Sequence, residues 1–242
     1  METTRCSTSN YIGSIITGSI VISEDGAGTI EWSNPTDPGG LGSYEGLGGT
    51  NALAYTGSVW VAAGKWGTQT ISLSPDGKIW QAAINPIGTI ISNSGNCIGL
   101  SPTGLVIGGN WLLSDYTTGS LTKASGTSLG YKWSNLILPT PLITNSVTIN
   151  SISYEPISGR YLLLGSWQDS TGTGFGNISV STDGQTWSPP IIPFDTTYTN
   201  SVANGAATDG SKWVVVGVFQ EPLSTTGASV AVSNNLTGQP YS

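Results

Sequence analysis

Carboxylates, aromatic rings and amides are the side chains of this sequence that could do chemistry, because the chain contains no histidine. Its 242 residues include 14 Asp and Glu, nine Trp and nine Tyr, but only seven Lys and Arg. Without imidazole there is no Ser-His or Cys-His nucleophile and no His-ligated zinc. The composition therefore favours a binding or structural protein over an enzyme.

A pair of carboxylates would still suffice for glycoside hydrolysis, since that reaction needs two Asp or Glu about 5 to 10 Å apart. Asp76 and Asp183 each precede a glycine between two strand patterns, and we expect both to form turns. Glu155 and Asp209 follow strand patterns and are expected in solvated turns. No catalytic residue is predicted, and a glycosidase is the least favoured function. No cofactor is predicted, nor is a metal site, because no closely spaced acidic run resembles a calcium loop.

Aromatic residues give a more specific hypothesis. Four of them stand two positions after a recurrent glycine, where a strand should run out into a loop: Trp66, Trp111, Trp167 and Phe219. An aromatic ring at such a loop stacks on a sugar face while polar neighbours bind its hydroxyl groups. The polar neighbours are Asn110, Gln168, Asp169 and Gln220. These residues form the candidate ligand site, although packing between sheets is the interpretation that we favour for the rings.

The elements that must position these residues repeat along the chain. The repeated strand has a large first residue, an apolar run and a glycine in fifth place; its copies are 60–66, 105–111, 161–167 and 213–219. A strand beginning with Asn precedes each copy, at Asn51, Asn96, Asn150 and Asn204. These amides could line a ligand-binding ring, but we favour a role in tying strands together. An alternating strand ending in serine follows, and Ser23, Ser74, Ser125, Ser181 and Ser233 are 51, 51, 56 and 52 residues apart.

Each repeat ends with a turn and a return strand that reaches a tryptophan. The copies are clearest at 74–80 and 181–187, where Asp-Gly lies between two strand patterns and predicts a hairpin. The tryptophans that end the return strands are predicted to lie in the core: Trp32, Trp80, Trp133 and Trp187.

Four short antiparallel strands per repeat predict an all-β fold, a single β-propeller domain over residues 1–242. We expect five blades of four strands, in units of about 10–48, 49–93, 94–146, 147–199 and 200–242. The first and last units are incomplete, so strands from both termini should close the ring and remove open sheet edges. An open arc, or pairing of the incomplete ends between chains, is the alternative.

The Ser-x-Asp-Gly-x-x-Trp segments at 74–80 and 181–187 resemble the Asp-box, or BNR-like, repeat of sialidase-type propellers. Similar repeats occur in bacterial surface proteins and in large DNA viruses. The resemblance implies a propeller in which Asp and Ser fix the turn and Trp packs between blades. Sialidases also use three arginines and a Tyr-Glu pair. This chain has only Arg5 and Arg160, so that activity is not expected.

The net charge of −7 argues against binding to nucleic acid, and no apolar run is long enough for membrane insertion. No secretory signal is visible, but a Ser-, Thr- and Gly-rich chain with few trypsin sites suits an extracellular or virion-surface location. Cys6 and Cys97 could form one bridge, although free thiols are favoured. The leading function is multivalent, non-catalytic binding of a surface glycan or a protein. The alternative is a structural subunit that contacts itself or its neighbours in a virion or other extracellular assembly.

Overall fold

The computed structural model describes residues 49–67, 69–81, 84–85, 90–113, 118–125, 132–134, 147–167, 178–189, 200–220 and 227–233. Within these ranges the chain forms thirteen β-strands and no helix. Accordingly, none of this part contains a helix able to cross a membrane. The expected first unit at 10–48, which includes Trp32, lies outside the described residues, as does Cys6.

The strands form four antiparallel sheets in chain order. The first sheet contains β1 (Gly49–Tyr55), β2 (Trp60–Trp66) and β3 (Gln69–Ser74). The second contains β4 (Ile90–Ser101), β5 (Gly104–Leu113), β6 (Thr118–Ser125) and β7 (Lys132–Trp133). The third contains β8 (Val147–Glu155), β9 (Arg160–Trp167) and β10 (Ile178–Ser181). The fourth contains β11 (Asn200–Thr208), β12 (Trp213–Gln220) and β13 (Gly227–Val232).

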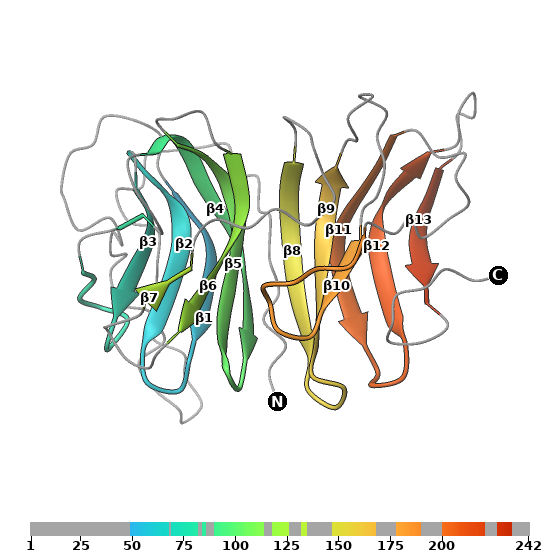
Figure 1. The fold of residues 1–242 in the computed structure, drawn as a ribbon, viewed down its shortest axis with the longest axis horizontal. Helices are drawn as coiled ribbons and strands as arrows, with labels where there is room; N and C mark the ends of the chain where they lie inside the picture. Colours follow the sequence, from blue (N-terminus) through green and yellow to red (C-terminus); the bar gives the residue numbers. More distant parts are fainter. Residues whose placement is uncertain are drawn as a thin grey trace, which may run out of the picture.

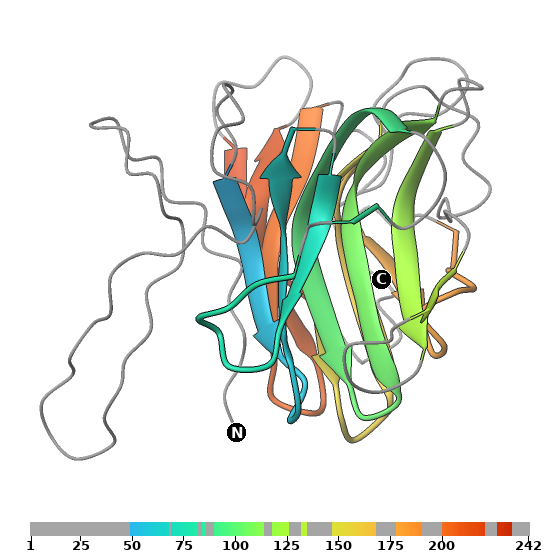
Figure 2. The same cartoon turned by 90° about the vertical axis from the view of Figure 1, so that its left-hand side faces the viewer.

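Successive sheets stand side by side in an arc. The first two sheets occupy one half of Figure 1 and the last two the other half, whereas the first and fourth share one side of Figure 2. The first strands β1, β4, β8 and β11 are neighbours in that order. Antiparallel sheets arranged in this way are the blades of a β-propeller. The predicted all-β fold class is confirmed, and the number of five blades stays a prediction.

The hydrophobic core is divided between neighbouring sheets, because the side chains of each central strand alternate between its two faces. In β9, Tyr161 and Leu163 pack against the second sheet. Leu162 and Leu164 pack against the fourth sheet. The same alternation places the first and third residues of each repeated strand toward the preceding sheet, and the second and fourth toward the following one. Cys97 is buried within the core between the second and third sheets, where its thiol donates to the Gly108 carbonyl oxygen at 3.9 Å.

In the first and third sheets, the described segment that the sequence predicts as a return strand is not a regular β-strand. Only the second sheet has one, β7, among the described residues. In the first and third sheets the chain after the tryptophan attaches by a backbone bond, from Gln81 N to Leu73 O and from Ser188 N to Val180 O, each 2.8 Å. A hydroxyl group on the third strand adds a second bond to the same segment. These bonds run from Ser72 to Gln81 O, Thr122 to Ser134 O and Ser179 to Ser188 O, at 2.7–3.0 Å.

The predicted alignment of the repeats, which matches Ser125 with Ser74 and Ser181, is wrong by one residue. Strand pairing places Ala124 opposite Leu105, whereas Ser74 is opposite Trp60 and Ser181 is opposite Tyr161. Ala124 is therefore the structural counterpart of the repeated serine. The one-residue shift turns Lys123 toward the third sheet, where its Nζ donates to the carbonyl oxygen of Asp183.

Candidate functional site

The repeated asparagines occupy a β-bulge in the first strand of every sheet. Pairing between the first and second strands shifts between residues 50 and 52, 95 and 97, 149 and 151, and 203 and 205. The residue left unpaired is Asn51, Asn96, Asn150 or Asn204. A bulge re-aims side chains and bends its strand, so it sets the direction of each amide.

The recurrent glycine of the second strand lies against this bulge. A Cβ atom added there would lie 2.0 to 2.2 Å from a carbonyl oxygen of the first strand. The four pairs are Gly64 with Gly49, Gly109 with Ser94, Gly165 with Thr148, and Gly217 with Val202. No side chain fits at such a distance, so the bulge and the glycine form one structural device.

The bulged asparagines link each sheet to the next. Asn51 donates from Nδ2 to the Gly95 carbonyl oxygen at 2.9 Å. Asn96 donates to that of Ile149 at 3.1 Å, and Asn150 to that of Ala203 at 3.0 Å. In each case the acceptor immediately precedes the asparagine of the next sheet. These three amide donors therefore connect neighbouring blades instead of presenting their N–H groups to a ligand.

Two of the four candidate stacking rings are buried. Trp111 is fully buried, and its Nε1 donates to Thr70 Oγ1 in the first sheet at 3.1 Å. Trp66 is 7% exposed and packs with Ala62 and Trp80. Neither ring has an open face for a sugar, so the stacking hypothesis is corrected at these two positions. Asn110, in contrast, is exposed.

The other half of the candidate ligand site is not placed by the structure. Trp167 ends β9, and Phe219 and Gln220 end β12, but their side chains lie outside the described part of the chain. Gln168 and Asp169 lie wholly outside the described residues. Of the predicted site, the structure thus buries two rings, exposes Asn110 and leaves the other five residues untested.

Asp76 and Asp183 organise equivalent turns. Their Oδ1 atoms accept backbone N–H groups at 2.7–2.8 Å, from residues 78 and 79 and from residues 185 and 186. The hydroxyl groups of Ser74 and Ser181 bond the same carboxylates at 3.1 and 3.0 Å. The intervening glycines have φ of 75° and 70°, a conformation that glycine adopts without strain. The following tryptophans of the first and third sheets, Trp80 and Trp187, are buried.

These bonds favour the ionised carboxylates. Backbone N–H groups of Ile79 and Lys78 lower the pKa of Asp76 from its ordinary value. Partial burial acts to raise the pKa of Asp183, but bonds from Thr186, Gln185 and Ser181 outweigh it and lower the pKa to about 2. Both groups are consequently hydrogen-bond acceptors at neutral pH and have no proton to give.

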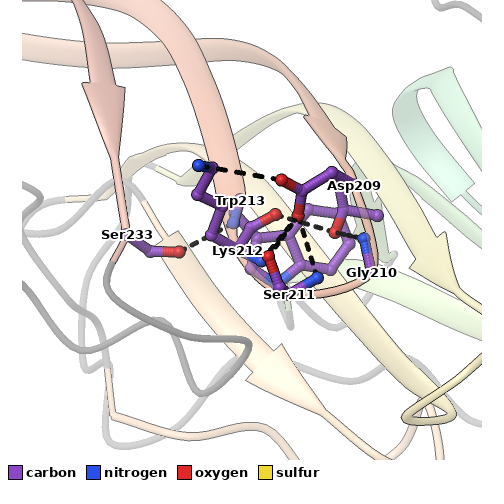
Figure 3. A network of polar contacts seen from close by, with 7 residues as sticks. Asp209, Gly210, Ser211, Lys212, Trp213 and Ser233 are labelled. Atoms are coloured by element: carbon purple, nitrogen blue, oxygen red, sulfur yellow. Dashed lines mark hydrogen bonds and ion pairs between the residues drawn. The ribbon is translucent and has the colours of Figure 1, made fainter.

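Asp209 has the same role in the turn between β11 and β12 (Figure 3). Its Oδ1 accepts the Ser211 hydroxyl at 2.7 Å, the Ser211 N–H at 2.9 Å and the Lys212 N–H at 3.0 Å. The Lys212 ammonium lies 3.7 Å from Oδ2. Chiefly through the Ser211 hydroxyl and these backbone bonds, the pKa of Asp209 is lowered to about 2.

Glu155 differs from its expected solvated position, since it is only 1% exposed. Its Oε1 accepts the Ile157 N–H at 2.7 Å, and its Oε2 accepts the Ser158 N–H. Burial acts to raise the pKa of this carboxyl, but the bonds from Ser158 and Ile157 lower it overall. The buried carboxylate accepts the N–H groups of its own turn, a role that the sequence pattern did not reveal.

Each of the four described carboxylates therefore serves its own hairpin turn. No group of His, Cys, Asp or Glu among the described residues could hold a metal ion. The carboxylates accept local N–H and O–H groups, which is turn formation, and none has a raised pKa suited to a general acid.

Comparisons with known proteins add little to this description of the site. No family model matches the chain, and no curated protein matches it. Among solved structures, the chain is similar to one described as YCF48 bound to D1 peptide, with a TM-score of 0.40 and 15% sequence identity. The alignment covers 82% of this chain and 57% of that chain, so this chain spans little more than half of that protein's length. Similarity at this level says nothing of function.

Proposed function

We propose that this protein is a non-catalytic β-propeller module that binds a protein partner at an extracellular or particle surface. The observation that carries the proposal is the engagement of all four described carboxylates in their own turns, with lowered pKa values. A two-carboxylate glycosidase needs one carboxyl that keeps its proton near neutral pH. Turn-forming carboxylates of this kind instead support a rigid binding surface.

A protein partner is favoured over a glycan because Trp66 and Trp111 are buried in the sheet packing. Glycan binding then depends on the remaining candidate residues, which are Asn110, Trp167, Gln168, Asp169, Phe219 and Gln220. Repeated weak sites of that kind would bind usefully only through multivalency.

The experiment that separates these functions is a glycan-array screen of the purified chain, with turnover of a panel of aryl glycosides measured on the same preparation. We expect neither array binding nor hydrolysis. Glycan binding that disappears in a folded Trp167→Ala, Phe219→Ala double variant, but survives in a variant of an exposed residue outside the candidate site, Gln185→Ala, would replace the protein-partner proposal with a lectin. Hydrolysis that is lost in Asp183→Asn would instead show that the protein is an enzyme.

A structural subunit of a virion or extracellular assembly is the second candidate. It is favoured by the hydrogen bonds that join successive sheets, since these make a rigid body. The subunit function predicts association of the purified chain with itself as its concentration rises. Sedimentation velocity over a hundredfold range of concentration tests this, and a constant monomeric coefficient argues against self-assembly.

A further inference from the structure

The bulged asparagine of the fourth sheet, Asn204, differs from the other three in the residue that follows it. That residue is Gly205, whereas the first three sheets have Ala52, Cys97 and Ser151 in its place. Asn204-Gly205 is also the only Asn-Gly step in the whole sequence. Because glycine has no Cβ atom, its backbone nitrogen can approach the preceding side chain without the obstruction that any other residue causes.

The fold does not require a glycine at position 205. A Cβ atom there would meet only Val216 Cγ2, at 3.5 Å, which is an ordinary van der Waals contact. Gly217, which lies against the same bulge, is different, since its Cβ would lie 2.1 Å from the Val202 carbonyl oxygen. Steric need therefore explains Gly217 and does not explain Gly205.

The amide nitrogen of Asn204 is accessible. The side chain is exposed, and the residue has no partner in β12 because the strand pairing shifts between Ala203 and Gly205. A bulge disrupts the ladder locally, so it holds this residue less firmly than a paired one. The amide nitrogens of the other three bulged asparagines each donate to a carbonyl oxygen of the next sheet. Among the described residues, none accepts a hydrogen bond from the amide nitrogen of Asn204.

The amide oxygen of Asn204, in contrast, is held by a donor. Asn150 Nδ2 donates to Asn204 Oδ1 at 3.1 Å. Nucleophilic attack on an amide carbon places negative charge on the amide oxygen, and a donor already directed at that oxygen stabilises the charge. The contact therefore favours attack at the Asn204 Cγ atom.

We propose that Asn204 is a modification site, at which the folded chain deamidates with water as the only co-reactant. The Gly205 nitrogen forms a bond to Asn204 Cγ, and the Cγ–Nδ2 bond breaks. Ammonia leaves with the proton of the Gly205 nitrogen, and a five-membered succinimide ring remains. Water then opens this ring, at Cγ to give aspartate or at the main-chain carbonyl carbon to give isoaspartate. This inference is independent of the function proposed above.

The Asp-Gly turns offer the same glycine nitrogen in the opposite environment. The nitrogen atoms of Gly77, Gly184 and Gly210 each donate to a Ser or Thr hydroxyl group, at 2.8–3.0 Å. The carboxyl groups that precede them have lowered pKa values and are ionised. An ionised carboxylate resists nucleophilic attack more than an amide does. We therefore expect these three steps to stay intact while Asn204 changes.

The two products act differently on the fourth sheet. Aspartate keeps the main chain unchanged, and its carboxylate accepts the Asn150 N–H in a stronger, charge-assisted bond. Isoaspartate adds a methylene group to the main chain of β11 beside its pairing with β12. The isoaspartate form should therefore have a less stable fourth sheet, so each molecule changes with age at one defined position.

Peptide mapping of the aged protein tests this site. The full chain is incubated at physiological pH and temperature, sampled over weeks, digested with trypsin and analysed by tandem mass spectrometry. Trypsin separates Asn204, in peptide 161–212, from Asn150, in peptide 133–160. We expect Asn204 to deamidate at least about tenfold faster than Asn150 or Asn51, because its neighbouring nitrogen is unobstructed. A fresh sample digested in parallel measures the deamidation that digestion itself causes.

Three variants separate the native geometry from a general opening of the chain. Gly205→Ala gives Asn204 the following residue that Asn51 has, and should slow its deamidation by at least about tenfold. Gly49→Ala is the matched control and should leave the rate unchanged, because a Cβ there meets nothing within 4 Å. Asn150→Ala removes the donor to Oδ1 and should slow the reaction, although it destabilises the fold.

Three results would overturn the proposal. Deamidation of Asn204 no faster than that of Asn150 would mean that the folded chain protects this step. An unchanged rate in Gly205→Ala would exclude attack by the Gly205 nitrogen. Faster deamidation in Asn150→Ala would place the reaction in opened molecules and not in the native bulge. Circular dichroism checks that each variant folds. If Gly205→Ala does not, Asn204→Gln replaces it, because its six-membered ring should form at least about tenfold more slowly.

Discussion

At the scale of single residues, the asparagine in each of the first three bulges has two roles. Its backbone is the extra residue of the first strand, and its amide donates to the next sheet. Neutral hydrogen bonds contribute about 1 kcal/mol each, and more when their loss leaves a buried group unpaired. The repeated asparagine is therefore best understood as a connector between blades.

Replacing one connector tests this role. Asn150→Ala removes the bonds to Ala203 O and Asn204 Oδ1, and should lower the free energy of unfolding by about 1–3 kcal/mol. Asn110→Ala is the matched control, because this exposed asparagine should change stability by about 0.5 kcal/mol or less. Urea titration of both variants measures the difference, and equal losses would contradict the connector role.

The turn carboxylates predict an acid-dependent stability. Asp183 has a pKa of about 2 in the folded chain against an ordinary value of 3.8, so folding favours its ionised form. The stability that ionised Asp183 adds to the folded chain is fully present at pH values above the ordinary pKa of 3.8, and it is lost as the pH falls toward 2. An asparagine can accept the same turn bonds but does not titrate. Asp183→Asn should therefore fold, and its unfolding free energy should fall less steeply between pH 4 and pH 2 than that of the native chain. Parallel slopes in urea titrations at several pH values would contradict this.

At the scale of elements, the bulge in one strand and the glycine in its neighbour require each other. The bulge brings a carbonyl oxygen into the space that a side chain would need. This explains why glycine recurs in fifth place within a strand, where it is otherwise unfavourable. The turn at the end of the first and third sheets is a separate local device, built from Ser, Asp and Gly within a few residues.

Gly165→Ala tests the fit between bulge and glycine. The new Cβ would lie 2.0 Å from the Thr148 carbonyl oxygen, so the two strands must separate. We expect a loss of about 3 kcal/mol or more, or failure to fold. Gly49→Ala is the control, since a Cβ there meets nothing within 4 Å. Thermal and urea unfolding of both variants give the comparison, and a stable Gly165→Ala would show that the bulge is not required.

At the scale of the whole molecule, the arrangement of the basic residues predicts resistance to trypsin. Lys65, Lys123, Lys132 and Arg160 lie within strands, where the backbone is paired. Lys78 and Lys212 are exposed in turns. Paired backbone must open before a protease can bind it. Such resistance suits the extracellular or particle-surface location that we propose.

Limited digestion followed by mass spectrometry measures this resistance. Within the described part of the chain, early cleavage should occur after Lys78 and Lys212. Cleavage after Lys65, Lys123 and Arg160 should be at least about tenfold slower, because it requires a sheet to open. First cleavage within β2, β6 or β9 would show that the sheets are less stable than their packing implies.

The sequence by itself determined the features that depend on neighbouring residues. Ser, Asp and Gly at 74–77 and 181–184 predict their turns because the bonds that fix those turns span only a few residues. The spacing of the repeats likewise predicts an all-β chain of similar sheets. These interactions are short in range, so the pattern carries them directly.

Only the tertiary structure decided what each repeated residue contacts in the next blade. The acceptor of Asn96 is the carbonyl of Ile149, and the partner of the Trp111 indole is Thr70, 41 positions away. A one-residue change of register moves Lys123 to the other face of its sheet, and no spacing rule fixes that register. Burial of Trp111, one of the candidate sugar-binding rings, follows from the same cause. Packing between blades joins residues roughly one repeat apart, and such contacts exist only once the sheets stand side by side.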